Sequence, residues 1–132
     1  MDRFPLQVCT VVLSLIPIIT GVVTLLGIKD PLYRPLGLPS APILDSNLRF
    51  FGGVWLGLGL AMLWLVPAIE HQGVLFRVLW GAIFLGGVGR VLPWRLIGAP
   101  PKPFIGVTLL ELLGAPLFIY WQSRVAQALG TP

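Results

Sequence analysis

The chain has 132 residues, of which 56% are hydrophobic and only 11% are charged, and its mean hydropathy is +0.91. Soluble domains carry about a quarter charged residues, so a soluble fold of this composition would lack the polar side chains to cover its surface. The net charge of +4 comes from scattered basic residues, which suits the charge asymmetry of membrane proteins better than a nucleic-acid-binding face. Cys9 is the only cysteine, which excludes a disulfide framework and a zinc-cysteine site.

Four apolar stretches, separated by short connections, make up most of the chain. Each is about long enough to cross roughly 30 Å of hydrocarbon as a helix. They predict membrane spans over approximately residues 5–28, 46–69, 74–94 and 104–122. The first run is longer than the core of a signal peptide and has no clear cleavage site, so we expect it to be retained. The sequence therefore predicts an all-α integral membrane protein with a single domain over residues 1–132, a four-helix bundle of antiparallel up-down spans.

Small and hydroxyl residues form a stripe along the first span. Thr10, Ser14, Pro17, Gly21 and Thr24 follow one another at steps of 4, 3, 4 and 3, which places them on one helix face. Small residues let a second helix approach closely, so we expect this face to pack inside the bundle. Alternatively, the hydroxyl groups only bond back to carbonyl groups of their own helix.

Two connections are rich in proline. Residues 29–44 contain Pro31, Pro35, Pro39 and Pro42, and residues 95–103 contain three more prolines. This spacing opposes a regular helix. We expect the first loop to be an interfacial connector, with a binding lid over the bundle mouth as the alternative.

Four of the charged residues inside the predicted spans or at their ends combine two acids with two arginines. Asp45 and Arg49 open the second span, Arg90 lies near the end of the third, and Glu111 lies two turns inside the fourth. Antiparallel threading puts all four on one side of the membrane. An unpaired charge at the bilayer centre costs about 2.5–3.5 kcal/mol on insertion scales, so pairing of the two acids with the two arginines explains the set together.

Two interpretations of this polar cluster stay open at the level of the sequence. The cluster either fixes helix register and orientation, or it lines a polar pocket for a lipid headgroup, a quinone or a small anion. Asp45 is also a candidate N-cap of the second span. Glu111 is the candidate for proton-coupled transport, although pairing with an arginine opposes the change of charge that such transport needs.

Small residues continue the helical pattern around these charges. In the second span, Gly53, Gly57 and Ala61 extend the stripe of Asp45 and Arg49 at steps of four. The corresponding small residues of the third and fourth spans are Ala82, Gly86, Gly114 and Ala115. We expect all of these to be helix-packing positions, either within a monomer or between copies of the chain.

The sequence contains none of the common catalytic motifs. It contains no H-E-x-x-H, G-x-S-x-G, Walker or dinucleotide-binding fingerprint. Cys9 lies in an apolar span without a neighbouring histidine, which favours an inert thiol. His71 stands among loop residues with no second ligand type clustered nearby, so we expect neither catalysis nor metal binding from it. The sequence indicates no particular cofactor.

Three pieces of the chain resemble a known family. They are LDSNLRFFGGVWLGLG (residues 44–59), GGVGRVLPWRLIGAPPKP (residues 86–103) and the helix that carries Glu111. They resemble an uncharacterised bacterial family of four-span membrane proteins that is known only as a domain of unknown function and is similar to the broader DoxX-like group. The resemblance covers nearly the whole chain and implies a four-helix bundle in a bacterial inner membrane.

The resemblance implies little about activity. DoxX-like proteins are linked to quinone-dependent oxidoreductase complexes or to the assembly of other membrane proteins, which is an analogy at the level of the fold. This chain has no paired-cysteine motif, so thiol chemistry does not carry over.

We therefore expect a multi-pass inner-membrane protein with a non-enzymatic role. It would act as an accessory protein or subunit that uses the cluster of Asp45, Arg49, Arg90 and Glu111 to bind a lipid-like or quinone-like molecule or a partner membrane protein. The alternatives are a redox or lipid-modifying enzyme subunit and a small proton-coupled transporter that uses Glu111. The basic residues of the first and third loops predict that these loops lie in the cytoplasm.

Overall fold

The computed structural model describes residues 2–130, and every regular element in that range is helical. The α-helices are α1 (Phe4–Thr24), α2 (Pro42–Leu65), α3 (Gly73–Leu96), α4 (Lys102–Leu109) and α5 (Ala115–Ala128). Three short 3₁₀ helices lie between them, η1 (Gly27–Lys29), η2 (Arg34–Leu36) and η3 (Val66–Ala68), and a π-helical segment, η4 (Leu110–Gly114), joins α4 to α5.

Four helical stretches of the described residues are long and apolar enough to cross a membrane. They are Phe4–Thr24, Pro42–Ala68, Gly73–Leu96 and Lys102–Ala128. The predicted all-α fold with four membrane-length helices is therefore confirmed. Large apolar side chains such as Phe50, Leu85 and Leu117 are exposed along these stretches, as expected of side chains that face lipid.

The chain divides into two compact units, and each is described by itself. The N-terminal unit comprises residues 7–66, with most of α1 and all of α2. The C-terminal unit comprises residues 67–132 together with the first six residues, and it contains α3, α4, η4 and α5.

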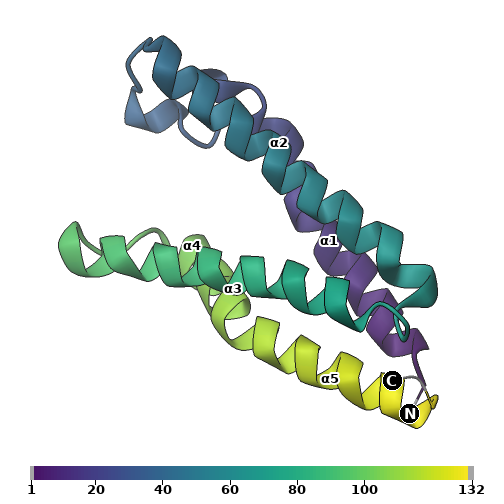
Figure 1. Ribbon diagram of the computed structural model, residues 1–132. Helices are drawn as coiled ribbons and strands as arrows, with labels where there is room; N and C mark the ends of the chain where they lie inside the picture. The colour runs from purple at the N-terminus through teal and green to yellow at the C-terminus, as the bar shows by residue number, and fades with distance from the viewer. Residues whose placement is uncertain (1, 131–132) are drawn as a thin grey trace. The chain divides into compact units, whose positions relative to one another are not determined.

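Small residues bring the two helices of the N-terminal unit into backbone contact (Figure 1). A Cβ atom on Gly52 would lie 2.8 Å from the backbone nitrogen of Leu25, and one on Gly59 would lie 2.8 Å from Ile18 Cγ1. A Cβ on Gly21 would lie closer still to α2, 2.6 Å from the backbone nitrogen of Leu56. No larger residue fits at these positions without moving a helix, so glycine sets the distance between α1 and α2.

The stripe predicted along the first span is largely buried. Thr10, Ser14, Pro17 and Gly21 are buried, and α1 continues through the proline. Ser14 Oγ also donates to the carbonyl of Val11 at 2.7 Å. Packing and hydroxyl back-bonding are therefore combined on this face.

Aromatic packing holds the C-terminal unit together. Phe76, Trp80, Ile83 and Gly87 recur at helical spacing on α3, and all four are buried. The Trp80 ring stacks on Phe118 of α5 with centroids 4.6 Å apart and planes 5° from parallel. Such stacking adds to the burial of two large apolar surfaces, so it fixes α3 against α5.

The second helix begins earlier than predicted. Pro42 opens α2, and the N-cap residue is Ala41. Asp45 therefore lies within the first turn of the helix, and its interpretation as the N-cap is wrong. The prediction treated Pro42 as a helix breaker, whereas proline is favoured in the first turn because its missing N–H has no partner there in any case.

Candidate functional site

Asp45 and Arg49 form an ion pair within α2. Arg49 Nε lies 2.7 Å from Asp45 Oδ2, across one helical turn. Arg49 Nη1 also donates to the carbonyl of Leu25 at 2.8 Å, and Nη2 donates to that of Leu26 at 3.3 Å. Since α1 has ended at Thr24, these carbonyls lie just beyond the C-terminus of a helix, where a cation is favoured.

The carboxylate of Asp45 also bonds to the segment after α1, so Asp45 and Arg49 together link the two helices; we call this pair and its bonds the clamp. Its Oδ1 accepts a hydrogen bond from the backbone N–H of Ile28 at 3.0 Å. The backbone reaches that point through Gly27, which has a φ of 65° and whose Cβ, if present, would overlap Asp45 Oδ1. All three guanidinium nitrogens of Arg49 are engaged in this way, so the pair fastens the end of α1 to the start of α2.

Arg90 and Glu111 form the second ion pair, between α3 and η4. Arg90 Nε lies 2.9 Å from Glu111 Oε2 and 3.2 Å from Oε1. The Glu111 side chain is 5% exposed, whereas that of Arg90 is 39% exposed. A buried carboxylate in a membrane-length helix needs a partner, and Arg90 supplies it from the neighbouring helix.

The backbone around Glu111 is built for close approach. Glu111 lies in the π-helical segment η4, an uncommon conformation that is frequent at functional sites. On the facing helix, a Cβ on Gly87 would lie only 2.8 Å from Glu111 Cβ. Gly87 therefore admits the Glu111 side chain beside α3, one helical turn before Arg90.

The two arginines differ in how much of the guanidinium is used. Arg90 contacts Glu111 through Nε alone, and its terminal nitrogens make no hydrogen bond with residues 2–130. Its Cζ lies 6.0 Å from the ring centroid of Phe104, at the outer limit of a cation–π contact. Arg90 thus retains more unused hydrogen-bond donors than Arg49, whose guanidinium makes four hydrogen bonds.

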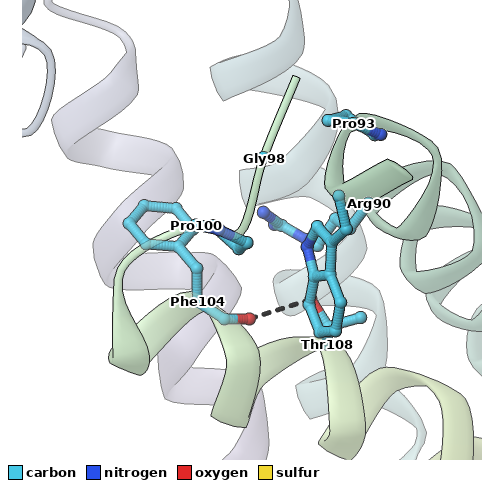
Figure 2. A pocket seen from close by; sticks show the side chains of 7 residues that line it. Arg90, Pro93, Gly98, Pro100, Phe104 and Thr108 are labelled. Atoms are coloured by element: carbon cyan, nitrogen blue, oxygen red, sulfur yellow. Dashed lines mark hydrogen bonds between the residues drawn. The ribbon is translucent and has the colours of Figure 1, made fainter. Parts of the chain in front are cut away.

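A pocket of about 160 Å³ opens beside Arg90. It lies between the end of α3, the following loop and the first turns of α4, and Figure 2 shows its lining. The lining residues are Arg90, Pro93, Trp94, Gly98, Pro100, Phe104 and Thr108. The hydroxyl of Thr108 donates to the carbonyl of Phe104 at 2.8 Å, the bond dashed in Figure 2. The pocket is therefore mostly apolar with one cationic group, as is common for ligand sites.

The structure pairs the four predicted residues two by two. Asp45 and Arg49 meet within the N-terminal unit, and Arg90 and Glu111 meet within the C-terminal unit. A single cluster of all four residues stays a prediction.

The predicted helix-packing residues have varied surroundings. Ala115 is buried, and a Cβ on Gly114 would lie 3.1 Å from Leu110 Cδ1. Gly53 lies near the Leu25 side chain, whereas Gly57 and Gly86 have no atom within 4 Å of a Cβ position. Ala61 is partly exposed and Ala82 is exposed. Their role between helices or copies of the chain stays a prediction.

Three polar residues escaped the sequence prediction. Asp30 is completely buried and accepts hydrogen bonds from Thr24 Oγ1 and the backbone N–H of Leu32. Its signal was the Asp30-Pro31 dipeptide, which is typical of a turn start. In the C-terminal unit, Glu70 pairs with Arg3, and the buried Gln122 donates to the carbonyl of Ile69.

His71 is exposed, and its Nε2 lies 3.8 Å from Glu70 Oε1. Across residues 2–130, no three histidine, cysteine, aspartate or glutamate side chains gather as a metal site would require.

Of three comparisons with known proteins, one finds a match. No curated protein and no solved structure matches the chain. One family model matches residues 5–122, which include the Asp45–Arg49 pair, the Arg90–Glu111 pair and the pocket. By this match the chain belongs to the family described as a domain of unknown function, DUF4345.

Proposed function

We propose that this small membrane protein is a non-enzymatic accessory protein that binds a lipid-like or quinone-like molecule in the Arg90 pocket. The observation that carries the proposal is that Arg90 uses only one of its three guanidinium nitrogens within the described part of the protein. Its Nε neutralises the buried Glu111, while its outer nitrogens are left for a ligand in the pocket that Arg90 lines. Ionisable groups inside membrane-spanning segments are costly, so they are candidates for function.

The size of the pocket supports an amphiphile. Sites for complete drug-sized ligands measure roughly 300–1,000 Å³, whereas this pocket measures about 160 Å³. It holds a headgroup or a single ring, and the rest of the molecule would lie along the exposed apolar side chains of the helices. Leu92, Leu96 and Ile97 are exposed beside the pocket-lining segment.

The setting of this function is part of the proposal. The resemblance of residues 44–59 and 86–103 to bacterial four-span proteins supports an inner-membrane location and kinship with the DoxX-like group. Kinship of that kind concerns the fold, so the binding role is argued from Arg90 and the pocket alone.

Mass spectrometry of gently extracted protein tests the binding role. We expect one small molecule per chain to co-purify with the wild type and to be lost in Arg90→Ala. Arg95→Ala is the matched control, because it removes an arginine of the same helix end that does not line the pocket. A wild type without a bound molecule, or equal retention in Arg90→Ala, would overturn the proposal.

A further inference from the structure

We infer that the pocket selects an anionic head, the phosphate or carboxylate of a membrane amphiphile, and that the terminal nitrogens of Arg90 bind it. This inference rests on the proposed function and names the chemical class of its ligand. It goes beyond that function because a neutral quinone-like head would satisfy the proposal equally well.

Arg90 has guanidinium donors that Glu111 does not occupy. A guanidinium carries five N–H donors in a planar fork. Both oxygens of Glu111 lie near Nε, at 2.9 and 3.2 Å, which leaves four donors on the two terminal nitrogens. A phosphate or carboxylate accepts two parallel bonds from such a fork, whereas one neutral carbonyl oxygen cannot match it.

The other side chains that line the pocket are compatible with an anion. No carboxylate lines the pocket, so no lining side chain would repel an anion. Trp94 offers an indole N–H donor, and the Thr108 hydroxyl proton is donated to Phe104. The remaining lining is proline, glycine and phenylalanine. Among the lining side chains, donors therefore outnumber acceptors, which favours a ligand rich in acceptor oxygens.

Positive charge beyond Arg90 lies near the pocket. Arg90 and Glu111 neutralise each other, so an anionic ligand needs further positive charge nearby. Lys102, the first residue of α4, is exposed and lies close in sequence to the lining residues Pro100 and Phe104.

Titration with defined lipids tests the inference. Purified protein in a neutral detergent is titrated with short-chain phosphatidylglycerol, phosphatidylcholine and a short-chain quinone, and bound molecules are counted by native mass spectrometry. We expect phosphatidylglycerol to bind at least about tenfold more tightly than the other two, a free-energy difference of roughly 1.4 kcal/mol. The preference should disappear in Arg90→Ala and persist in Arg95→Ala.

Two further variants guard against a folding defect, because Arg90→Ala leaves the buried Glu111 without its partner. The double variant Arg90→Gln/Glu111→Gln removes both charges and should lose the preference while it stays folded. Arg90→Lys keeps the charge but not the fork and should retain only part of the preference.

The outcomes separate this inference from the proposed function. Equal binding of all three probes, with loss of all three in the double variant, overturns the anionic class and leaves a ligand pocket. Binding that no Arg90 variant changes overturns both. Inorganic phosphate serves as the competitor. Displacement of phosphatidylglycerol by millimolar phosphate would overturn recognition of an amphiphile, and persistence of the bound lipid supports it.

Discussion

Arginine serves two different purposes in this chain, and the difference lies in its nitrogens. Arg49 uses all three to join Asp45 to the carbonyls of Leu25 and Leu26. Arg90 uses Nε alone and lines a pocket with the rest of its guanidinium. The first arrangement uses every guanidinium nitrogen, and the second leaves both terminal nitrogens without an acceptor among residues 2–130. We therefore expect variants of the two residues to fail in different assays.

Arg49→Ala should destabilise the protein without a direct effect on binding. The variant removes two hydrogen bonds beyond the end of α1 and leaves the Asp45 carboxylate without its cation. We expect the melting temperature in detergent to fall by several degrees. Arg34→Ala is the control, because Arg34 is exposed and its side chain makes no hydrogen bond or ion pair within the described residues. Equal melting of the two variants would refute the clamp.

Gly27 gives a second test of the clamp. Gly27 and Gly37 both have left-handed backbone conformations, with φ of 65° and 57°. A Cβ on Gly27 would overlap Asp45 Oδ1, whereas one on Gly37 would have no atom within 4 Å. Gly37→Ala should therefore lower the free energy of unfolding by only about 1–2 kcal/mol, the cost of placing alanine in a left-handed backbone conformation.

We expect Gly27→Ala to be clearly less stable than Gly37→Ala in thermal unfolding, because it also displaces Asp45. If the two alanine variants lost the same stability, the backbone conformation alone would explain both, and the contact with Asp45 would carry no weight.

The sequence predicts the identity of these charged residues better than their contacts. Charges are scarce in an apolar chain, so Asp45, Arg49, Arg90 and Glu111 stand out. The bonds of Arg49 to Leu25 and Leu26 depend on where α1 ends relative to α2, which no local pattern encodes. Asp30 was missed because an aspartate before proline looks like an ordinary turn residue.

At the scale of elements, the fourth membrane-length helix departs from a regular α-helix. Its π segment η4 carries Glu111 and faces Gly87 of α3. Glycine at that position and the extra backbone width at η4 together let a carboxylate lie between two helices. Helix periodicity predicts neither feature, because a single π-helical segment leaves the apolar pattern almost unchanged.

Gly87→Ala should weaken this contact, and Gly86→Ala is its matched control. A Cβ on Gly87 would lie 2.8 Å from Glu111 Cβ, whereas one on Gly86 would meet nothing within 4 Å. We expect Gly87→Ala to lower the melting temperature and to reduce the bound molecule per chain. Gly86→Ala should be neutral or more stable by about 0.5–1 kcal/mol, the usual helix preference for alanine. A Gly87→Ala variant as stable as Gly86→Ala would contradict the close packing of α3 on η4.

Adjacent glycines explain why the tightest contacts were hard to predict. The pairs Gly52-Gly53 and Gly86-Gly87 each put a small residue on two neighbouring faces of one helix. In each pair only one glycine makes a close approach to a neighbouring element, Gly52 in the first pair and Gly87 in the second. A spacing rule cannot choose between such neighbours, since the choice depends on which face meets another helix.

At the scale of the whole molecule, composition was the strongest predictor. Low charge and four long apolar stretches leave few alternatives to four membrane-length helices, because backbone groups in lipid must be satisfied within each helix. The pocket could not be predicted in this way. It is formed by a loop that returns between α3 and α4, with lining residues from Arg90 to Thr108.

The most direct test compares the bound molecule in two arginine variants. Native mass spectrometry is applied to wild type, Arg49→Ala and Arg90→Ala extracted from the same membrane. We expect one bound amphiphile per chain in the wild type and in folded Arg49→Ala, and none in Arg90→Ala. Loss from Arg49→Ala with retention in Arg90→Ala, or retention in both, would contradict the assignment of binding to the Arg90 pocket.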